Sequence, residues 1–203
     1  MVTGTDPFTQ PLTPEILTTL AIDIIAETNQ VRTDPVGYAA KLEDLRPYYQ
    51  DRIVKIPGQP AVATEEGVTA LDEAIADLKK RTPMSALATS SGLNQSAADH
   101  AQDIGSGGGF SHYGRDGSKP MERAQRYGIV PPGEQVGENI SYGPPTLAEW
   151  HVIQLLVDDN VPSRAHREAM LRTRYQLGGA ACAPHTTEFR IVCVVLYASD
   201  YEE

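Results

Sequence analysis

Three short stretches of this 203-residue chain contain the residue types that bind metal ions or transfer protons. Residues 110–117 (FSHYGRDG) contain His112, residues 137–140 (GENI) contain Glu138, and residues 157–167 (VDDNVPSRAHR) contain two acids and a histidine. Imidazole nitrogens and carboxylate oxygens are ligands of zinc and also act as general acids and bases. If folding brings the three stretches to one cleft, they form a site for a divalent cation or for acid–base chemistry.

The two upstream candidates are expected outside helices. His112 follows a run of glycines and precedes Gly114, so we expect it in a loop, where polar side chains often carry function. Glu138 stands between a glycine and an asparagine at the start of an expected strand, and a carboxylate buried there needs a cation or hydrogen bonds. The simpler alternatives are a surface histidine and a turn acid exposed to water.

The third stretch offers one histidine and a pair of acids. Ser163 is expected to cap a helix, which places His166 near its third position. Asp158 and Asp159 lie where the preceding helix should end, a position that is unfavourable for negative charge. Another group should therefore hold at least one of these carboxylates. The simpler alternatives are that His166 is a partly buried histidine bonded to backbone and that the two acids pair with nearby arginines.

The chain has two cysteines, Cys182 and Cys193, on the last two expected strands. They can face each other across a hairpin and form either one disulfide or two buried thiols, and a disulfide indicates an oxidising compartment. Two cysteines are too few for a thiolate zinc site or for a disulfide scaffold. Paired-cysteine metal motifs, phosphate-binding loops, HExxH helices and GxSxG turns are absent from the sequence.

Composition restricts the partners of the chain. With 17 Lys and Arg against 27 Asp and Glu, the formal net charge is −10, which disfavours a nucleic-acid partner. The best apolar run, residues 191–198, is strand-sized and far shorter than the roughly 20 residues of a membrane-spanning helix. The first residues show no cationic stretch followed by an apolar one, so no signal peptide is visible. The chain is therefore either cytoplasmic or a trimmed mature form.

The elements expected to position these residues are mostly helices, followed by late strands. The apolar spacing and the capping residues predict helices over residues 13–34, 34–45, 64–81, 85–104, 119–127, 147–157 and 163–171, and strands over 139–142, 178–183 and 188–198. Residues 1–12 are expected to form a flexible arm, and residues 53–63 an irregular surface loop. Because strands and helices do not alternate, the pattern favours an α+β fold over a parallel-sheet fold.

Taken in chain order, these strings resemble the CAP superfamily of cysteine-rich secretory proteins, antigens and pathogenesis-related proteins, in its bacterial SCP-like extracellular branch. The resemblance covers most of the chain and rests on the segments 29–32 (NQVR), 93–101 (LNQSAADHA), 110–112 (FSH), 137–140 (GENI) and 163–167 (SRAHR). Together these segments are much more specific than any one of them. Residues 13–203 then form a single domain, in which residues 48–83 look like a helical insertion relative to the minimal domain.

The resemblance implies a three-layer α-β-α sandwich with a small, mainly antiparallel sheet. It also implies a cleft with two histidines and two acids that can hold a divalent cation, often zinc. By motif position His112, Glu138 and His166 match three of the four residues. Asp159 or Asp158 stands where the family has a glutamate, and the shorter side chain reduces the reach of this ligand.

The function implied by the resemblance is that of a secreted, monomeric binding domain whose cleft holds a divalent cation and a small or lipid-like ligand, without nucleic acid or a transmembrane segment. An extracellular or cell-envelope location, with the signal peptide removed, implies one disulfide between Cys182 and Cys193. An alternative is a zinc-dependent, peptidase-like hydrolase with Glu138 or the Asp158/Asp159 pair as general base. A third hypothesis is a structural extracellular domain in which the four side chains form a hydrogen-bonded network.

Overall fold

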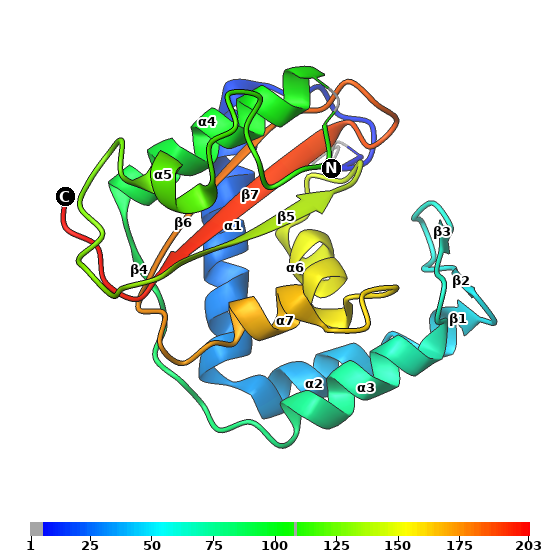
Figure 1. The fold of residues 1–203 in the computed structure, drawn as a ribbon. Coiled ribbons are helices and arrows are strands. Elements are labelled where there is room, and N and C mark those ends of the chain that lie inside the picture. Colours follow the sequence, from blue (N-terminus) through cyan, green and yellow to red (C-terminus); the bar gives the residue numbers. More distant parts are fainter. Residues whose placement is uncertain (1–5, 108) are drawn as a thin grey trace.

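A four-stranded sheet built mainly from the last third of the chain organises the fold. The computed structural model describes residues 6–107 and 109–203, and in it the strand order is β4 (Ala88–Thr89), β6 (Leu177–Pro184), β7 (Ile191–Ala198) and β5 (Val136–Tyr142) (Figure 1). β7 pairs antiparallel with both β5 and β6, whereas the short β4 pairs parallel with β6. All residues of β7 are buried, which explains its continuous apolar run, because both faces of the strand are covered.

Helices cover both faces of the sheet, which confirms the expected three-layer α+β architecture. Cys193, Val195 and Tyr197 of β7 face the core made with α1 (Pro14–Thr33) and α6 (Ala148–Val157). The alternate β7 residues face a second core made with α4 (Ser91–Gly107) and α5 (Pro120–Ala124). The remaining helices, α2 (Pro35–Glu43), α3 (Val68–Leu78) and α7 (Ala165–Met170), extend the first layer away from the sheet (Figure 1).

Several elements differ from the expectations drawn from the sequence. The segment expected as an irregular loop, residues 53–63, contains β2 (Ile53–Val54) and β3 (Val62–Ala63). These strands form a small antiparallel sheet with β1 (Tyr49–Gln50), which follows the 3-10 turn η1 (Arg46–Tyr48). Gly58, with φ of +77°, lies in the connection between β2 and β3. The helix expected from residue 85 begins at Ser91, because residues 88–89 pair with β6 and the Ser90 hydroxyl accepts the Leu93 N–H.

The N-terminal segment is also packed more closely than expected. Residues 1–5 of the expected flexible arm lie outside the described residues, but Phe8 is buried. The Arg190 guanidinium donates to the carbonyls of Phe8 and Gln10, and the Thr146 N–H donates to the Pro7 carbonyl. This part of the chain is therefore fixed to the end of the sheet.

The buried Arg32 joins the end of α1 to the chain that enters β6. Its guanidinium donates to the carbonyls of Met170 and Tyr175, both at 2.8 Å, and to those of Ser85 and Arg172 at 3.1 and 3.2 Å. Burial lowers the pKa of this guanidinium. One side chain thus donates to four backbone carbonyls from two segments of the chain, which gives the NQVR string a structural role.

A disulfide joins the two strands that end the fold. Cys182 and Cys193 are direct partners in the register of β6 and β7, with a Cα–Cα distance of 4.1 Å. The disulfide alternative is therefore confirmed, and the two-thiol alternative is wrong. Such bonds persist in oxidising compartments and are rare in cytosolic proteins.

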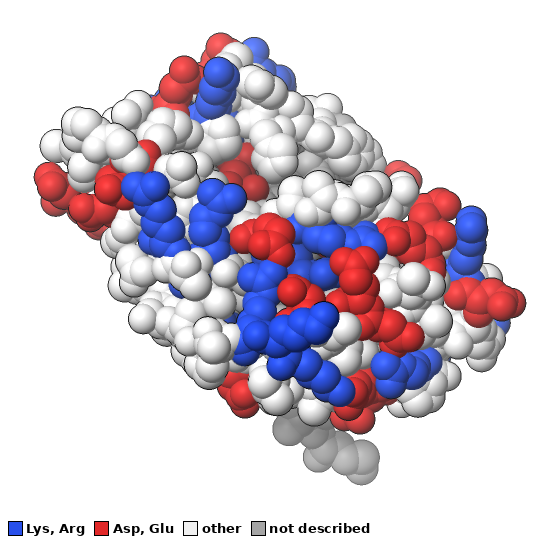
Figure 2. Space-filling model, turned by 60° about the horizontal axis from the view of Figure 1, so that its bottom comes forward, with Lys and Arg blue, Asp and Glu red and all other residues white. Residues whose placement is uncertain are grey.

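Charged side chains of both signs share one face of the molecule. Over the face seen in Figure 2, basic and acidic side chains are interleaved and do not separate into regions of one sign. The ion pairs Lys79–Glu43, Arg46–Asp72 and Arg81–Asp77 are of this kind. Among the helices of residues 6–107 and 109–203, none combines the length and the apolar character needed to cross a bilayer.

His151 makes folding stability sensitive to acid. Its Nε2 donates to the Pro145 carbonyl, so its Nδ1 accepts the Ser141 hydroxyl, and burial lowers its pKa to about 4. The unfolded chain takes up a proton near pH 6.5, whereas the folded chain does so only near pH 4. The free energy of unfolding should therefore be flat above pH 6.5 and fall by about 3 kcal/mol as the pH drops towards 4. Urea denaturation across this range measures the slope, which should diminish in His151→Gln, and an unchanged slope in that variant would contradict the assignment.

Candidate functional site

Glu138 is a buried carboxylate at the centre of the first half of the site. β5 carries it opposite Leu196 of β7, and its side chain is 1% exposed. One carboxylate oxygen accepts a hydrogen bond from His112 Nδ1 at 2.9 Å, and the other accepts from the Arg123 guanidinium at 2.6 Å. The expectation that a buried Glu138 needs a cation or hydrogen bonds is met by these two residues.

Arg123 also fixes the loop that carries His112. This arginine is 2% exposed, and its guanidinium donates to the backbone carbonyls of His112 and Ser118 at 3.2 and 2.7 Å. The loop is therefore closed around the same guanidinium that neutralises Glu138. His112 itself remains half exposed, because only its Nδ1 side is turned to the buried carboxylate.

The second half of the site is the pair of His166 and Asp158. α6 ends at Asp158, which has a left-handed backbone with φ of +56°. Its carboxylate accepts hydrogen bonds from His166 Nδ1 at 2.6 Å and from the His166 backbone N–H at 2.9 Å. The expectation that Ser163 caps the following helix is wrong: Arg164 occupies the N-cap position, and the Asp158 carboxylate satisfies the first backbone donors.

Asp159 does not join this pair. Its two carboxylate oxygens accept the backbone N–H groups of Glu65 and Glu66 at 2.7 and 2.9 Å, just before α3. The left-handed turn at Asp158 directs the two adjacent acids to different partners, so Asp158 and not Asp159 is the acid that contacts His166. The contacts of Asp159 anchor the segment before α3, and Asp159 also lines the cavity described below, so its candidate role as metal ligand or general base stays a prediction.

Both imidazoles lie on the wall of one cavity of about 450 Å³. Its other walls are mainly apolar and come from β5, α6 and the segment 45–64, including Tyr49, Val54, Val62, Ile140, Tyr142, Trp150 and Ile153. Sequence reasoning missed the contribution of residues 45–64, although Val54, Ile56 and Val62 are apolar residues within a segment rich in turn residues. The cleft is thus mainly apolar, with its polar lining residues at Thr64, His112, Gln154, Asp158, Asp159 and His166.

A set of ion pairs fastens this apolar wall to the loop that bears His166. The Arg164 guanidinium donates to both oxygens of Glu66 at 2.7 Å and also to Glu73 of α3. These hydrogen bonds, together with one from the Asn160 backbone N–H, lower the pKa of Glu66 to about 2. The cavity wall and the His166 loop therefore form one connected unit.

His100 is a further histidine of the site that motif reasoning did not select. It is fully buried on α4, its Nε2 lies 2.9 Å from the Ser111 carbonyl and 3.8 Å from a Glu138 oxygen, and burial lowers its pKa. Its Nδ1 has no hydrogen-bond partner among the described residues. The signal in the sequence was the DHA string (residues 99–101) on the inner face of an expected helix. A histidine there is equally consistent with a buried core residue.

The donor set does not make a four-ligand metal centre. Because carboxylates only accept hydrogen bonds, Nδ1 of His112 and of His166 must carry the proton, which leaves Nε2 of each ring as an acceptor or ligand. Over residues 6–107 and 109–203, no group of three or more His, Cys, Asp or Glu side chains is placed to hold a metal ion. Both oxygens of Glu138 and of Asp158 are already bonded, so these acids orient the imidazoles.

Residues 25–197 match the CAP family, described as the cysteine-rich secretory protein family. The chain belongs to this family. The resemblance inferred from the FSH, GENI and HR strings is thereby confirmed. A search of the curated proteins gives no match.

Two solved bacterial structures resemble this CAP protein. An extracellular protein containing an SCP domain from Bacillus anthracis superposes with a TM-score of 0.52 at 14% identity, over 93% of this chain and 44% of that one, which supports the fold alone. An outer surface protein from Borrelia burgdorferi has 24% identity and a TM-score of 0.46, over 63% of this chain and 86% of its own.

Experiment can distinguish the roles of the two adjacent acids, Asp158 and Asp159. Asp158→Asn should lose the fixed protonation of His166 Nδ1, because an amide no longer provides two accepting oxygens to the ring and the backbone. Long-range ¹H–¹⁵N NMR correlations should show the Nδ1–H tautomer of His166 in the parent protein and a mixture in this variant.

The matched control is Asp159→Asn, in which the adjacent acid is changed in the same way. The His166 correlations should be unaffected, and the loss should appear only at the amides of Glu65 and Glu66. If Asp159→Asn alters the His166 ring while Asp158→Asn leaves it unchanged, the assignment of the acid is wrong.

Proposed function

We propose that this CAP domain binds a small, largely apolar molecule whose polar end is held by His112 and His166. The observation that carries the proposal is that both imidazoles, each oriented by a buried carboxylate, line the same mainly apolar cavity. A volume of about 450 Å³ falls within the range of pockets that bind small molecules. A mainly apolar wall with two carboxylate-oriented imidazoles supports orientation of a ligand with one polar end.

The hydrogen bonds of the rings favour a hydroxyl as the polar end of the ligand. In its neutral form each ring uses its Nδ1–H on a carboxylate, so its free Nε2 accepts a hydrogen bond and does not donate one. A ligand hydroxyl can donate to one Nε2, whereas a carboxylate ligand cannot. We therefore propose a long-chain alcohol or a related hydroxyl lipid as the ligand class.

We also propose that the protein works outside the cytoplasm. The Cys182–Cys193 disulfide supports an oxidising compartment, and the two similar bacterial structures are an outer surface protein and an extracellular protein. The hydrolase alternative has no observation in its favour here, because both oxygens of Glu138 are engaged and Asp159 caps backbone amides.

Decanol binding tests the ligand proposal. Decanol should bind the parent protein in a saturable manner by calorimetry, and decyl methyl ether, which lacks the hydroxyl donor, should bind about tenfold more weakly. His166→Phe should remove most of this difference between the two probes, because it removes one acceptor and keeps an apolar ring. Val62→Trp should weaken both probes, since it places a larger side chain in the cavity wall.

Tyr113→Ala is the matched control for the loop, because Tyr113 is exposed beside His112 but does not line the cavity. Its affinity for decanol should equal that of the parent protein. Equal affinity of decanol for the parent, His166→Phe and Val62→Trp proteins would refute the assignment of this cavity.

The divalent cation remains a prediction and rests on the two Nε2 atoms. A zinc site with three or four protein ligands binds far more tightly than one with two, so we expect zinc to bind weakly and only when both imidazoles are present. Titration calorimetry with zinc chloride should give heat with the parent protein and none with His112→Phe or His166→Phe. Heat that persists in both variants would assign zinc to another part of the molecule, and no heat with the parent would refute the cation while leaving the decanol result to stand.

A further inference from the structure

The outer edge of β6 is open over most of its length. β4 pairs with β6 only through Ala88–Leu177 and Thr89–Gly178, after which the chain turns into α4. From Ala180 to Pro184, no strand of residues 6–107 and 109–203 pairs with this edge. Over residues 180–184 the sheet therefore ends at β6, which is paired there on one side only.

The direction of the backbone groups at this edge follows from the disulfide pair. The Cα–Cα distance of 4.1 Å between Cys182 and Cys193 is that of a non-hydrogen-bonded antiparallel pair, whose N–H and C=O groups point away from the partner strand. Gly178 and Ala180, which lie four and two residues before Cys182 on the same strand, also direct their backbone groups to this side. The Gly178 carbonyl accepts the Ser90 N–H, and the Ala180 N–H donates to Asn94 Oδ1. The N–H and C=O of Cys182 thus face the open side, and no hydrogen bond to them is formed within the described chain.

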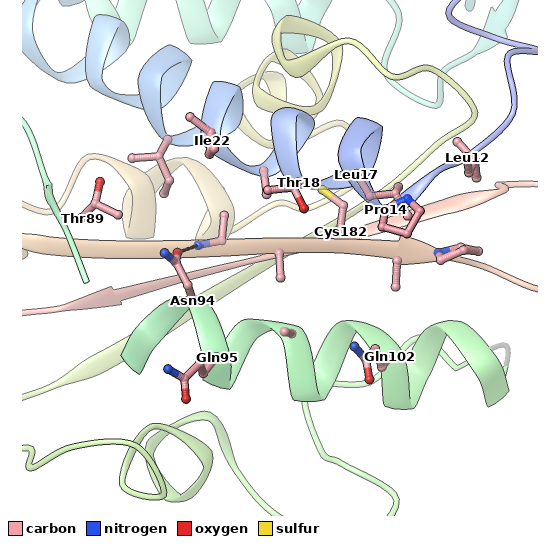
Figure 3. A pocket seen from close by; sticks show the side chains of 17 residues that line it. Leu12, Pro14, Leu17, Thr18, Ile22, Thr89, Asn94, Gln95, Gln102 and Cys182 are labelled. Atoms are coloured by element: carbon pink, nitrogen blue, oxygen red, sulfur yellow. Dashed lines mark hydrogen bonds between the residues drawn. The ribbon is translucent and has the colours of Figure 1, made fainter. Parts of the chain in front are cut away.

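A groove of about 650 Å³ lies along this edge. Figure 3 shows β6 between α1 on one side and α4 on the other, with Thr18 and Ile22 on the first helix and Gln95 and Gln102 on the second. All 17 lining residues are uncharged, although 22% of the chain is charged. Exposed edges usually carry charged residues that prevent strand pairing, and this edge has none.

We propose that this groove binds an extended peptide segment of a partner protein, which adds to β6 as a new edge strand in line with β4. Hydrogen bonds to the Cys182 backbone would fix the peptide, and its side chains would alternate between α1 and α4. The absence of charge selects a segment of uncharged, small or apolar residues, because a buried charge would find no partner there. β4 already occupies the start of this position, so the peptide continues a pairing that the fold itself uses.

The groove shares no lining residue with the cavity of His112 and His166. The two proposals therefore fail or succeed separately.

Amide exchange with and without peptide tests the inference. In ¹⁵N-labelled protein the Cys182 amide should exchange much faster than that of Val194 in the central strand. A library of end-blocked hexapeptides of Ala, Val, Thr and Ser should then slow Cys182 exchange by about tenfold or more. Hexapeptides with alternate N-methyl groups should give no protection, because they keep the side chains but cannot form the ladder.

Ile22→Lys and Gln102→Lys place charges on exposed positions of the two groove walls and should abolish the protection. Thr19→Lys, at an exposed position of α1 outside the groove, should leave the protection unchanged. Four results would overturn the proposal: slow Cys182 exchange without peptide, no protection by the library, equal protection by N-methylated peptides, or protection that rises with protein concentration alone and so indicates a second copy of this chain.

Discussion

The site depends on the burial of two carboxylates. Glu138 and Asp158 are almost fully removed from water, and a buried carboxylate is tolerated only when cations or donors surround it. The groups that satisfy them are the imidazoles of His112 and His166, the Arg123 guanidinium and backbone N–H groups. Each imidazole is consequently held in one tautomer and one orientation. The geometry of the cavity is thus a consequence of charge satisfaction within the protein.

The segment before α3 has a second, independent role in the same cavity. It adds an apolar wall to a site whose other polar and apolar parts come from β5, α6 and the His112 loop. Short two-residue strands are weak by themselves, so the segment needs anchors. Asp159 supplies one anchor through two backbone amides, and the Arg164 pairs with Glu66 and Glu73 supply the other. Both anchors start from the loop that orients His166, so the apolar wall and the second imidazole are mechanically linked.

Local signals in the sequence predicted the α+β class and three candidate site residues, and the family resemblance implied the three layers. Apolar spacing and proline starts indicated the helices, and the FSH, GENI and HR strings indicated His112, Glu138 and His166. What it could not resolve depends on backbone direction and distant contacts. The choice between Asp158 and Asp159 follows from a left-handed backbone at one residue, and the role of residues 49–63 follows from the cavity that they line together with β5 and α6. The sequence also could not show that Glu138 and Asp158 orient the imidazoles, because this role follows from the hydrogen bonds that each carboxylate oxygen accepts.

The small residues of β6 connect the sheet to its open edge. Gly179 lies so close to α4 that a Cβ there would fall 2.5 Å from the Asn94 backbone nitrogen, so only glycine permits this approach. The alanines that follow have no side chain long enough to cover the edge, and Asn94 reaches only the Ala180 N–H. Close packing of α4 on β6 therefore requires small side chains, and small side chains leave the backbone of Cys182 uncovered. The small residues of β6 that let α4 pack against the sheet therefore also leave the groove open.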